Sequence, residues 1–575
     1  MFIRIMVLLA AVTTQALAAP TVVDSPLAIA PPVPGSFIVL SYHEVRDDVR
    51  DYPDPYAVDA ESLVRQFAWL RSNGYVPVSL DAIVKARRGG PPLPDRAVLL
   101  TFDDAYLSFY TRVYPLLREF GYPALLAVVG KWIDVPHATA MPYGEKGSVV
   151  EASFPSWAIL REMANSGLVE LASHSYDLHQ GVPANPQGNL QPAATARIYD
   201  AATGSYESDT AWRARVRADI VRSADVIERN TGKRPRAIVW PYGSYNQALM
   251  DIAADSGMSI GVTLDDGINT PEVSLATMRR TLIEHFPTLP EFAAEVRGAR
   301  YRAPIRVIEV SLDDVYSSDP ERQESNLSAL LDRIETLKPT HVFLHATTAP
   351  DQDGRIKATY FPNHGLPMRG DLFNRAAWQL ASRADVKVFA VMPLAIPQLS
   401  KAQLTELYEE LGRHASFDGL VFDEMSAADF PEAGTVATWS RQLATRCSEF
   451  HMPMPIVRKL RGGAVALAAN DAGSLAAYDY VALVMPLADG QAAGTSLPNT
   501  SVPPNKLIVM LQLDPYSSEP ASREIASRQM TDLQLNGVIN FGYITAGSLY
   551  DGTAPRQLAP AMSLRLYPQR QRAKD

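Results

Sequence analysis

The chain predicts an α/β fold in two parts: a barrel or partial barrel, followed by a (β/α)8 barrel. Short apolar runs rich in β-branched residues alternate with helix-like segments along most of the chain. Polar and charged residues recur directly after those runs, as they do at the C-terminal ends of parallel strands. At 575 residues the chain is also too long for one hydrophobic core, so two domains are expected.

The first domain is expected to span residues 36–300. Its predicted strands are Phe37–Tyr42, Val76–Val78, Ala97–Leu100, Ala124–Val129, Val169–Ala172, Ala237–Trp240 and Ser259–Leu264. Its predicted helices are Asp59–Ser72, Leu107–Phe120, Ser156–Ser166, Ala211–Asn230 and Asn246–Asp255. Gly74, Gly121 and Gly257 follow three of these helices and are expected to end them, because glycine accepts the left-handed conformation of a helix C-terminus.

One of the predicted strands runs into two adjacent carboxylates, in the sequence Thr101-Phe102-Asp103-Asp104. Two neighbouring carboxylates that point into one cleft repel each other unless a cation, a proton or separate hydrogen-bond networks relieve them. A bound metal ion is the simplest relief. The alternative is an Asp-Asp turn that only ends the strand.

Two histidines follow another predicted strand, in the sequence Ser173-His174-Ser175-Tyr176-Asp177-Leu178-His179. Two histidines and one aspartate form an N,N,O face that suits Zn²⁺, Co²⁺, Ni²⁺ or Fe²⁺ and leaves positions open for water and substrate. The sequence therefore predicts a divalent metal site at the carboxyl ends of the strands.

Composition and the first residues indicate where the chain works. Residues 1–18 combine Arg4, an apolar stretch and Ala16-Leu17-Ala18, which is the pattern of a secretory signal peptide, and residues 19–35 are expected to form an extended leader. The mature protein is therefore expected to be soluble outside the cytoplasm. A net charge of −10 argues against nucleic acid as a partner. The one cysteine, Cys447, cannot form an intrachain disulfide.

The second domain is expected to span residues 304–565. Its predicted strands are Ile305–Ser311, His341–Ala346, Val386–Pro393, Phe417–Phe422, Pro455–Leu460, Tyr478–Met485, Lys506–Leu513 and Val538–Tyr543. Eight strands in βα alternation are what a (β/α)8 barrel requires. Carboxylates that follow these strands are candidate functional residues: Asp313, Asp314, Asp351, Asp353, Asp423, Glu424 and Asp514.

The motifs of the first domain resemble those of the NodB-homology polysaccharide deacetylases. The resemblance rests on Thr101-Phe102-Asp103-Asp104, on the histidine pair and on Pro241-Tyr242-Gly243. It implies that Asp103 is the general base and that Asp104, His174 and His179 bind a divalent metal. It also assigns the backbone N–H of Tyr242 to the oxyanion.

Two further features resemble the poly-β-1,6-N-acetyl-D-glucosamine deacetylases of the PgaB type, in which the deacetylase motifs are circularly permuted. The two histidines are spaced five apart, and a histidine, His43, follows the first predicted strand. The resemblance implies that His43 is the general acid, with His285 as a weaker alternative. Other members hold the base with an arginine before the Pro-Tyr motif, and Arg234 and Arg236 are both candidates for that residue.

Amide hydrolysis needs an activated water, a polarised carbonyl and a proton for the leaving amine. A metal held by Asp104 and the two histidines would polarise the acetyl carbonyl. Asp103 would take the proton of the attacking water, and His43 would protonate the glucosamine nitrogen.

The second domain resembles the C-terminal domain of the same PgaB-type proteins, which binds partly deacetylated polymer and in some members cleaves it. The likeness is carried by Tyr360-Phe361-Pro362-Asn363, Asp371-Leu372-Phe373-Asn374-Arg375 and Ala377-Trp378-Gln379-Leu380. The chain departs from the family pattern at Asp423-Glu424-Met425, at Met510 and at Val391, which replace His-Asp-Asp, a glutamate and an aromatic residue. Asp423 and Glu424 could supply a catalytic acid pair, or they could be two solvated carboxylates at the barrel rim.

The resemblance, together with the predicted signal peptide, thus implies a periplasmic, metal-dependent N-deacetylase that partially deacetylates poly-β-1,6-N-acetyl-D-glucosamine for export and biofilm formation. Its partners are expected to be that polysaccharide and an outer-membrane export porin. No cysteine stands directly after the predicted signal peptide, so a lipid anchor is not expected. The alternatives are a peptidoglycan or chitin-oligomer deacetylase and a non-catalytic glycan-binding export scaffold.

Overall fold

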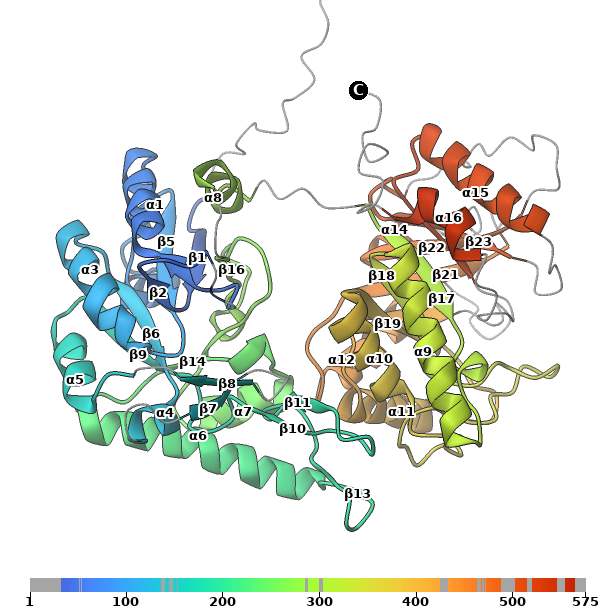
Figure 1. The fold of residues 1–575 in the computed structure, drawn as a ribbon, viewed down its shortest axis with the longest axis horizontal. Helices are drawn as coiled ribbons and strands as arrows, with labels where there is room; N and C mark the ends of the chain where they lie inside the picture. Colours follow the sequence, from blue (N-terminus) through green and yellow to red (C-terminus); the bar gives the residue numbers. More distant parts are fainter. Residues whose placement is uncertain are drawn as a thin grey trace, which may run out of the picture.

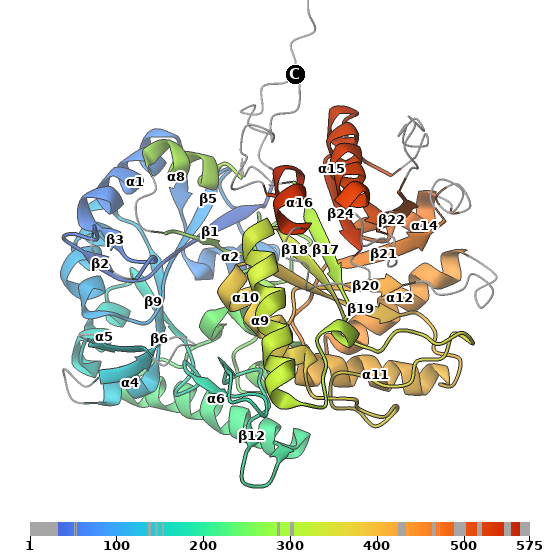
Figure 2. The same cartoon turned by 45° about the vertical axis from the view of Figure 1, so that its right-hand side comes forward.

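The structure is a computed structural model that describes most of residues 33–563. The gaps within this range are residues 51, 53, 136–139, 144–147, 152–153, 285–287, 299–303, 424–432, 463–466, 468–469, 471, 488–501, 514–519 and 545–553. The predicted signal peptide and the candidates His285, Glu424 and Asp514 lie outside the described residues. The first half, blue to green, and the second half, lime to red, are two bodies in Figure 1, and Figure 2 shows them from another side.

The first half is built on an open parallel sheet, which confirms the predicted partial barrel. In spatial order its strands are β15 (Ile260–Val262), β14 (Ala237–Val239), β9 (Val169–Ser173), β6 (Ala124–Val128), β5 (Ala97–Phe102), β1 (Phe37–Tyr42) and β16 (Thr281–Leu282), with β4 (Val76–Pro77) also paired to β5. The six residues of β5 are all buried, as expected for a central parallel strand that is covered on both faces. Pairs of short strands lie outside this sheet: β2 (Val45–Arg46) with β3 (Val58–Asp59), β7 (Ala140–Tyr143) with β8 (Ser148–Glu151), β10 (Gly181–Pro183) with β11 (Leu190–Pro192), and β12 (Tyr199–Asp200) with β13 (Ser205–Tyr206).

Helices cover both faces of the sheet. They are α1 (Ala60–Ser72), α2 (Leu80–Arg87), α3 (Tyr114–Phe120), α4 (Gly130–Asp134), α5 (Trp157–Asn165), α6 (Asp209–Thr231), α7 (Gln247–Asp255) and α8 (Leu289–Val296). Helices α1, α3, α5 and α8 share one hydrophobic cluster with the sheet, and α2 packs in a separate cluster. The predicted glycine stops are confirmed, because Gly74, Gly121 and Gly257 all have positive φ. Among the described helices, none is both long and apolar enough to cross a membrane.

The predicted helix Leu107–Phe120 differs from the structure in its first turns. Residues Phe109–Val113 form a π-helical turn, and the α-helix α3 follows it. Pro115 explains the difference, because it has no N–H with which to continue the α-helical hydrogen bonds across this point.

The second half is a closed barrel of eight parallel strands, as predicted. The strands are β17 (Arg306–Val310), β18 (His341–His345), β19 (Lys387–Pro393), β20 (Gly419–Asp423), β21 (Ile456–Arg461), β22 (Tyr480–Pro486), β23 (Leu507–Gln512) and β24 (Asn540–Ile544). The helices around them are α9 (Pro320–Leu337), α10 (Phe373–Ala384), α11 (Lys401–His414), α12 (Ala433–Cys447), α14 (Ala472–Ala476), α15 (Pro520–Leu535) and α16 (Ala554–Met562). Val391 and Met510, two of the departures from the family pattern, are buried together with Phe343 and Phe389 in an apolar cluster formed by the strands.

The two halves contact each other through hydrogen bonds and ion pairs. The Gln191 side chain donates to Asn374 at 2.7 Å, and Asn374 donates in turn to the Ala184 carbonyl at 3.0 Å. The Tyr206 hydroxyl donates to the Asp371 carboxylate. These contacts join β10, β11 and β13 of the first half to the start of α10 of the barrel.

The interface carboxyl of Asp371 makes stability depend on pH. Burial raises its pKa to about 6 from the ordinary 3.8, although the Tyr206 hydroxyl opposes the shift. The folded state therefore binds this proton more tightly than the unfolded state, and stability falls as the pH rises from about 4 to about 6. Asp371→Asn removes the charge and keeps an acceptor for Tyr206, so we expect it to stabilise the protein by roughly 1–2 kcal/mol at pH 7.5 and by nothing near pH 4.

Chemical unfolding at the two pH values measures this effect. The exposed Asp332→Asn on α9 is the matched control and should change stability at neither pH. Equal stability of the Asp371→Asn variant and the parent at pH 7.5 would contradict the prediction.

Candidate active site

The candidate residues of the first half gather at the carboxyl ends of its central strands. β1 and β5 are paired in register up to Tyr42 and Phe102, so the residues that follow, His43 and Asp103, leave the sheet side by side. The Asp103 N–H donates to the Tyr42 carbonyl at 2.9 Å, which continues the strand pairing by one residue. The structure thus brings residues from separate predicted strands to one edge, where α/β folds carry their chemistry.

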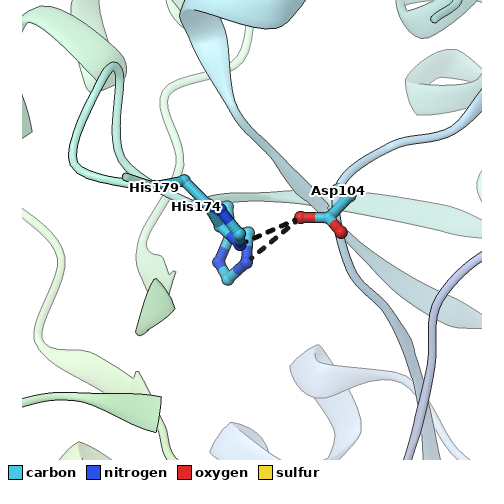
Figure 3. A group of neighbouring side chains, drawn as sticks. All are labelled: Asp104, His174 and His179. Atoms are coloured by element: carbon cyan, nitrogen blue, oxygen red, sulfur yellow. Dashed lines mark ion pairs between the residues drawn. The ribbon is translucent and has the colours of Figure 1, made fainter. Parts of the chain in front are cut away.

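Asp104, His174 and His179 form a buried group that could hold a metal ion. Asp104 Oδ1 lies 3.5 Å from His174 Nε2 and 3.3 Å from His179 Nε2, and Figure 3 shows both rings on the same side of the carboxylate. His174 Nδ1 lies 2.7 Å from the Val239 carbonyl, to which it donates, so Nε2 is the nitrogen that is left to bind a metal. Burial lowers the pKa of His174 to about 4 and that of His179 well below its ordinary value, so both rings are neutral, as metal ligands must be. The donor set of two nitrogens and one oxygen fits Zn²⁺, Co²⁺, Ni²⁺ or Fe²⁺.

A buried arginine, Arg280, holds the other carboxylate of the pair. Its Nη1 donates to both carboxylate oxygens of Asp103, at 2.7 and 2.9 Å, and to Ser41 Oγ at 3.0 Å. Burial by itself raises the pKa of Asp103, but Arg280 and the nearby His174 and His43 outweigh it and hold the pKa below its ordinary value. Asp103 is therefore an ionised carboxylate of fixed orientation.

Neither arginine proposed from the sequence contacts Asp103. Arg234 pairs with Asp225 and Glu228, and Arg236 pairs with Glu170. Arg236 stands directly before β14, at the amino end of a strand whose carboxyl end faces the site, so its side chain is at the wrong edge of the sheet. The sequence hint that we missed is the short apolar run Thr281-Leu282-Ile283, because the strand it forms brings Arg280 beside β1.

His43 lies beside Asp103 in the same site. Its Nε2 is 3.9 Å from Asp103 Oδ2, and its side chain is 12% exposed. Burial lowers the pKa of His43, while the negative charge of Asp103 raises it. The position allows His43 to exchange a proton with a substrate group that lies over Asp103.

Tyr242 follows β14 in an unusual backbone conformation, with φ of 57°. Six non-glycine residues among those described have positive φ, and four of them stand in the loops of this site: Asp104, Ala105, Ser175 and Tyr242. Such conformations cost energy and persist where the surrounding structure holds them, typically at functional sites. The Tyr242 ring lies 4.5 Å from the His179 ring, which brings this loop against the histidines.

Asp219, on α6, supports the loop between the two histidines, and the sequence analysis missed it. Its two carboxylate oxygens accept the backbone N–H groups of Tyr176 and Asp177, at 2.9 and 2.7 Å. Burial raises the pKa of Asp219 to about 6, although the two N–H groups oppose the shift. The carboxylate holds the short turn that brings His179 back toward His174.

Replacing Asp219 with asparagine is expected to weaken metal binding. The amide has one oxygen, so its NH2 group would face one of the two backbone N–H donors and displace the turn. Supporting residues of this kind typically change metal affinity by about 10- to 100-fold. We expect a loss of that size for Asp219→Asn in a Co²⁺ titration followed by absorbance. Asp225→Asn, on the exposed side of the same helix, should bind Co²⁺ like the parent, and an unchanged affinity in Asp219→Asn would refute the positioning role.

The barrel carries a second polar cluster at the carboxyl ends of its strands. Lys459, fully buried, donates to Glu309 at 2.5 Å and to Asp423 at 3.0 Å. Arg461 also pairs with Asp423, and His345 lies 2.8 Å from Glu309. Burial would raise the pKa of Asp423, but Lys459 and Arg461 outweigh it and hold the pKa well below its ordinary value. Asp423 is therefore a permanent carboxylate, which suits a base and not a proton donor.

Two further candidate carboxylates of the barrel are engaged in hydrogen bonds and ion pairs. Asp351 accepts the N–H groups of Asp353 and Arg355, so this segment is a turn. Asp313 accepts a hydrogen bond from the Tyr360 hydroxyl and pairs with Arg369 at 2.8 Å. Glu309, His345 and Asp423 could form a second metal group by position. The Lys459 ammonium and the Arg461 guanidinium already neutralise the two carboxylates and disfavour a further cation there.

Comparison with known proteins gives matches in both halves. A family model described as polysaccharide deacetylase matches residues 90–261, and one described as hypothetical glycosyl hydrolase family 13 matches residues 309–401. The poly-β-1,6-N-acetyl-D-glucosamine N-deacetylase of Escherichia coli strain K12 is 36% identical over 455 residues, which cover 73% of this chain and 67% of that protein.

Two solved structures from Bordetella bronchiseptica are also similar. The BpsB deacetylase domain is 50% identical and covers 44% of this chain and 99% of that one, with a TM-score of 0.41. The PgaB (BpsB) glycoside hydrolase domain is 27% identical and covers 46% of this chain and 100% of that one, with a TM-score of 0.40.

Proposed function

Because the chain belongs to the poly-β-1,6-N-acetyl-D-glucosamine N-deacetylase family, we propose that it removes acetyl groups from that polysaccharide with the help of a divalent metal ion. It is a polysaccharide N-deacetylase with a glycoside-hydrolase-like barrel. The observation that carries the proposal is one sheet edge with two features. It holds the ionised, tethered carboxylate of Asp103, and it holds Asp104 within 3.3–3.5 Å of the Nε2 atoms of His174 and His179.

The metal would be held by Asp104, His174 and His179. A divalent ion bound there supplies Lewis-acid chemistry: it polarises the acetyl carbonyl and lowers the pKa of water. The protein contributes neutral imidazoles, a fixed His174 tautomer and a buried position for all three ligands. Zn²⁺, Co²⁺, Ni²⁺ and Fe²⁺ are the candidate ions.

Asp103 takes the proton of the attacking water as general base. Arg280 keeps the carboxylate ionised and fixes the direction of its oxygens through hydrogen bonds of 2.7 and 2.9 Å. A base in this position must be within hydrogen-bond reach of the water and must be unprotonated at neutral pH. The buried ion pair with Arg280 supports the second condition, because it favours the ionised form of Asp103.

His43 donates a proton to the leaving glucosamine nitrogen, and Tyr242 stabilises the oxyanion. Water attacks the acetyl carbon, the C–N bond breaks, and the products are acetate and a free amine on the polymer. The backbone N–H of Tyr242 would donate to the carbonyl oxygen as negative charge develops there. The left-handed conformation of Tyr242, next to His179, supports this assignment.

Acetate release tests the proposed function. Purified protein is incubated with β-1,6-linked N-acetylglucosamine oligomers before and after chelation, and then with Zn²⁺, Co²⁺ or Ni²⁺ added back. We expect chelation to lower the rate by at least about 100-fold and one of these ions to restore it, because the metal supplies several kcal/mol of charge stabilisation. Mg²⁺ should not restore it, because Mg²⁺ prefers oxygen ligands.

Two controls make the assay decisive. His179→Ala should abolish the metal response, and His341→Ala, a change at the start of barrel strand β18, should leave it intact. If acetate were released faster from β-1,4-linked chitin oligomers or from peptidoglycan, the enzyme would be a chitin-oligomer or peptidoglycan deacetylase instead. Release that survives chelation would refute the metal requirement.

We further propose that the barrel holds the polymer. A glycoside hydrolase needs one carboxyl that can donate a proton. Asp423 is unsuited to that role, because Lys459 and Arg461 keep it ionised, and Glu424, the other carboxyl of the predicted pair, lies outside the described residues. Chain-length analysis of partly deacetylated oligomers tests this role: the length should stay unchanged after long incubation.

We also propose that the enzyme works in the periplasm, during polymer export and biofilm formation. The support is the pattern of residues 1–18, which is typical of a secretory signal peptide. Cell fractionation, with the amino terminus of the mature chain determined, tests the localisation. Co-purification with an outer-membrane porin tests the export partner.

A further inference from the structure

A small cavity lies in the joint between the deacetylase half and the barrel. It has a volume of about 110 Å³ and is lined by Arg197, Tyr206 and Ser244 from the first half and by Arg413 and His414 from the barrel. A space of this size holds a few water molecules or one small oxyanion. Both sides of the joint contribute polar side chains to its lining, among apolar ones.

Arg197 brings a buried cation to this cavity. Its side chain is 1% exposed, and its Nε and Nη2 donate to Asp209 Oδ1 at 3.3 and 3.0 Å. The flat guanidinium lies 3.9 Å from the Trp212 ring. Its Nη1 is buried, and no hydrogen-bond acceptor is in reach of it among the described residues. A buried donor on a charged group is costly unless an acceptor meets it.

Arg197 shares its carboxylate partner with a second arginine. Arg413, on the barrel side, has its Nε 3.0 Å from the same Asp209 oxygen and pairs with Glu409 at 2.7 Å. Arg446 also pairs with Glu409, at 2.7 Å. Three guanidiniums therefore share two carboxylates in this group. Burial lowers the pKa of Arg197 only to about 10, so it stays charged at neutral pH.

Four further ionisable groups of the joint have other partners or no negative charge to offer Arg197. Asp371 accepts the hydroxyl of Tyr206. Glu207 is engaged with Arg215 through both oxygens, at 2.9 and 2.8 Å. Asp418 lines the cavity, but its carboxylate accepts the Val388 N–H at 2.7 Å and its pKa is raised by burial. His414 is neutral, because burial lowers its pKa to about 3, and its buried Nδ1 also has no partner among the described residues.

We propose that this cavity binds a small oxyanion of the carboxylate or phosphate class, which accepts hydrogen bonds from Arg197 on one side and from His414 on the other. The bound anion neutralises the excess positive charge and ties the two halves together. The site lies outside the deacetylase centre and does not depend on its activity. Acetate, a product of amide hydrolysis, belongs to this ligand class, as does inorganic phosphate.

Thermal unfolding of the full chain tests the proposal. The protein is first treated with a chelator, so that no metal at Asp104 can bind the added anion. It is then unfolded in acetate, in phosphate and in chloride at equal ionic strength. We expect a saturable rise of several degrees in the unfolding temperature with acetate, phosphate or both, relative to chloride, because a ligand that binds only the folded state stabilises it.

Variants locate the effect. Arg197→Gln should abolish the rise, and Arg217→Gln, which changes an exposed arginine of α6, should keep it. Because Arg197→Gln also breaks the pair with Asp209, a second variant is needed. Ala196→Leu fills the cavity without removing a charge and should also abolish the rise.

Each outcome decides the question. A higher unfolding temperature with both acetate and phosphate supports a site for small oxyanions in general. A higher unfolding temperature with only one of them shows which anion the site binds. No rise above chloride in the parent protein overturns the proposal, and so does a rise that persists in Ala196→Leu.

Discussion

Replacing Asp103 with asparagine is expected to lower kcat for acetate release by about 10³-fold, within the range that general-base catalysis contributes. Asparagine keeps the shape of the side chain and an oxygen that can accept from Arg280, but it cannot take a proton from water. The KM should change little, because Asp103 is assigned to the water and not to the sugar.

The same substitution also acts on His43. The negative charge of Asp103, 3.9 Å from His43 Nε2, raises a pKa that burial lowers. With that charge removed, the pKa of His43 falls further and a smaller fraction of His43 carries the proton that the leaving nitrogen needs. The loss in Asp103→Asn should therefore exceed the loss in a variant that changes His43 alone.

Steady-state kinetics at several metal concentrations measures the effect. Asp95→Asn, an exposed change in the turn before β5, is the matched control and should leave kcat unchanged. Circular dichroism and a Co²⁺ titration should show that Asp103→Asn still folds and still binds metal. An Asp103→Asn protein with more than a tenth of the parent kcat would rule out Asp103 as the base.

Replacing Lys459 with methionine is expected to destabilise the barrel by about 3–5 kcal/mol, the usual cost of removing one partner from a buried ion pair. Lys459 is fully buried between Glu309 and Asp423, at 2.5 and 3.0 Å. Without it, two buried carboxylates face each other with His345 and Arg461 as their remaining partners.

Chemical unfolding of the full chain measures the loss. Lys357→Met, which removes an exposed lysine 3.8 Å from Asp351, should change stability by less than about 0.5 kcal/mol. Adding Glu309→Gln to Lys459→Met should recover part of the loss, because it removes one of the stranded charges. If Lys459→Met were as stable as the parent, the network would have no structural role.

The sequence by itself determined the two folds and the candidate site residues at strand ends. Asp103, Asp104, His174 and Tyr242 each follow a predicted strand, and parallel strands bring their carboxyl ends to one edge. The eight strands of the barrel could also be predicted from the sequence, because βα alternation is a local pattern. These features depend on a residue and its near neighbours in the chain.

Only the tertiary structure decided which residues support that chemistry. Arg280 holds Asp103, and Arg234 and Arg236 do not. Arg280 directly precedes β16, and β16 pairs with β1 although the two strands are far apart in the sequence. Asp219 and Lys459 are likewise brought to their partners by α6 and β21. Such contacts depend on the order of the strands and on the packing of helices against them, which no local pattern specifies.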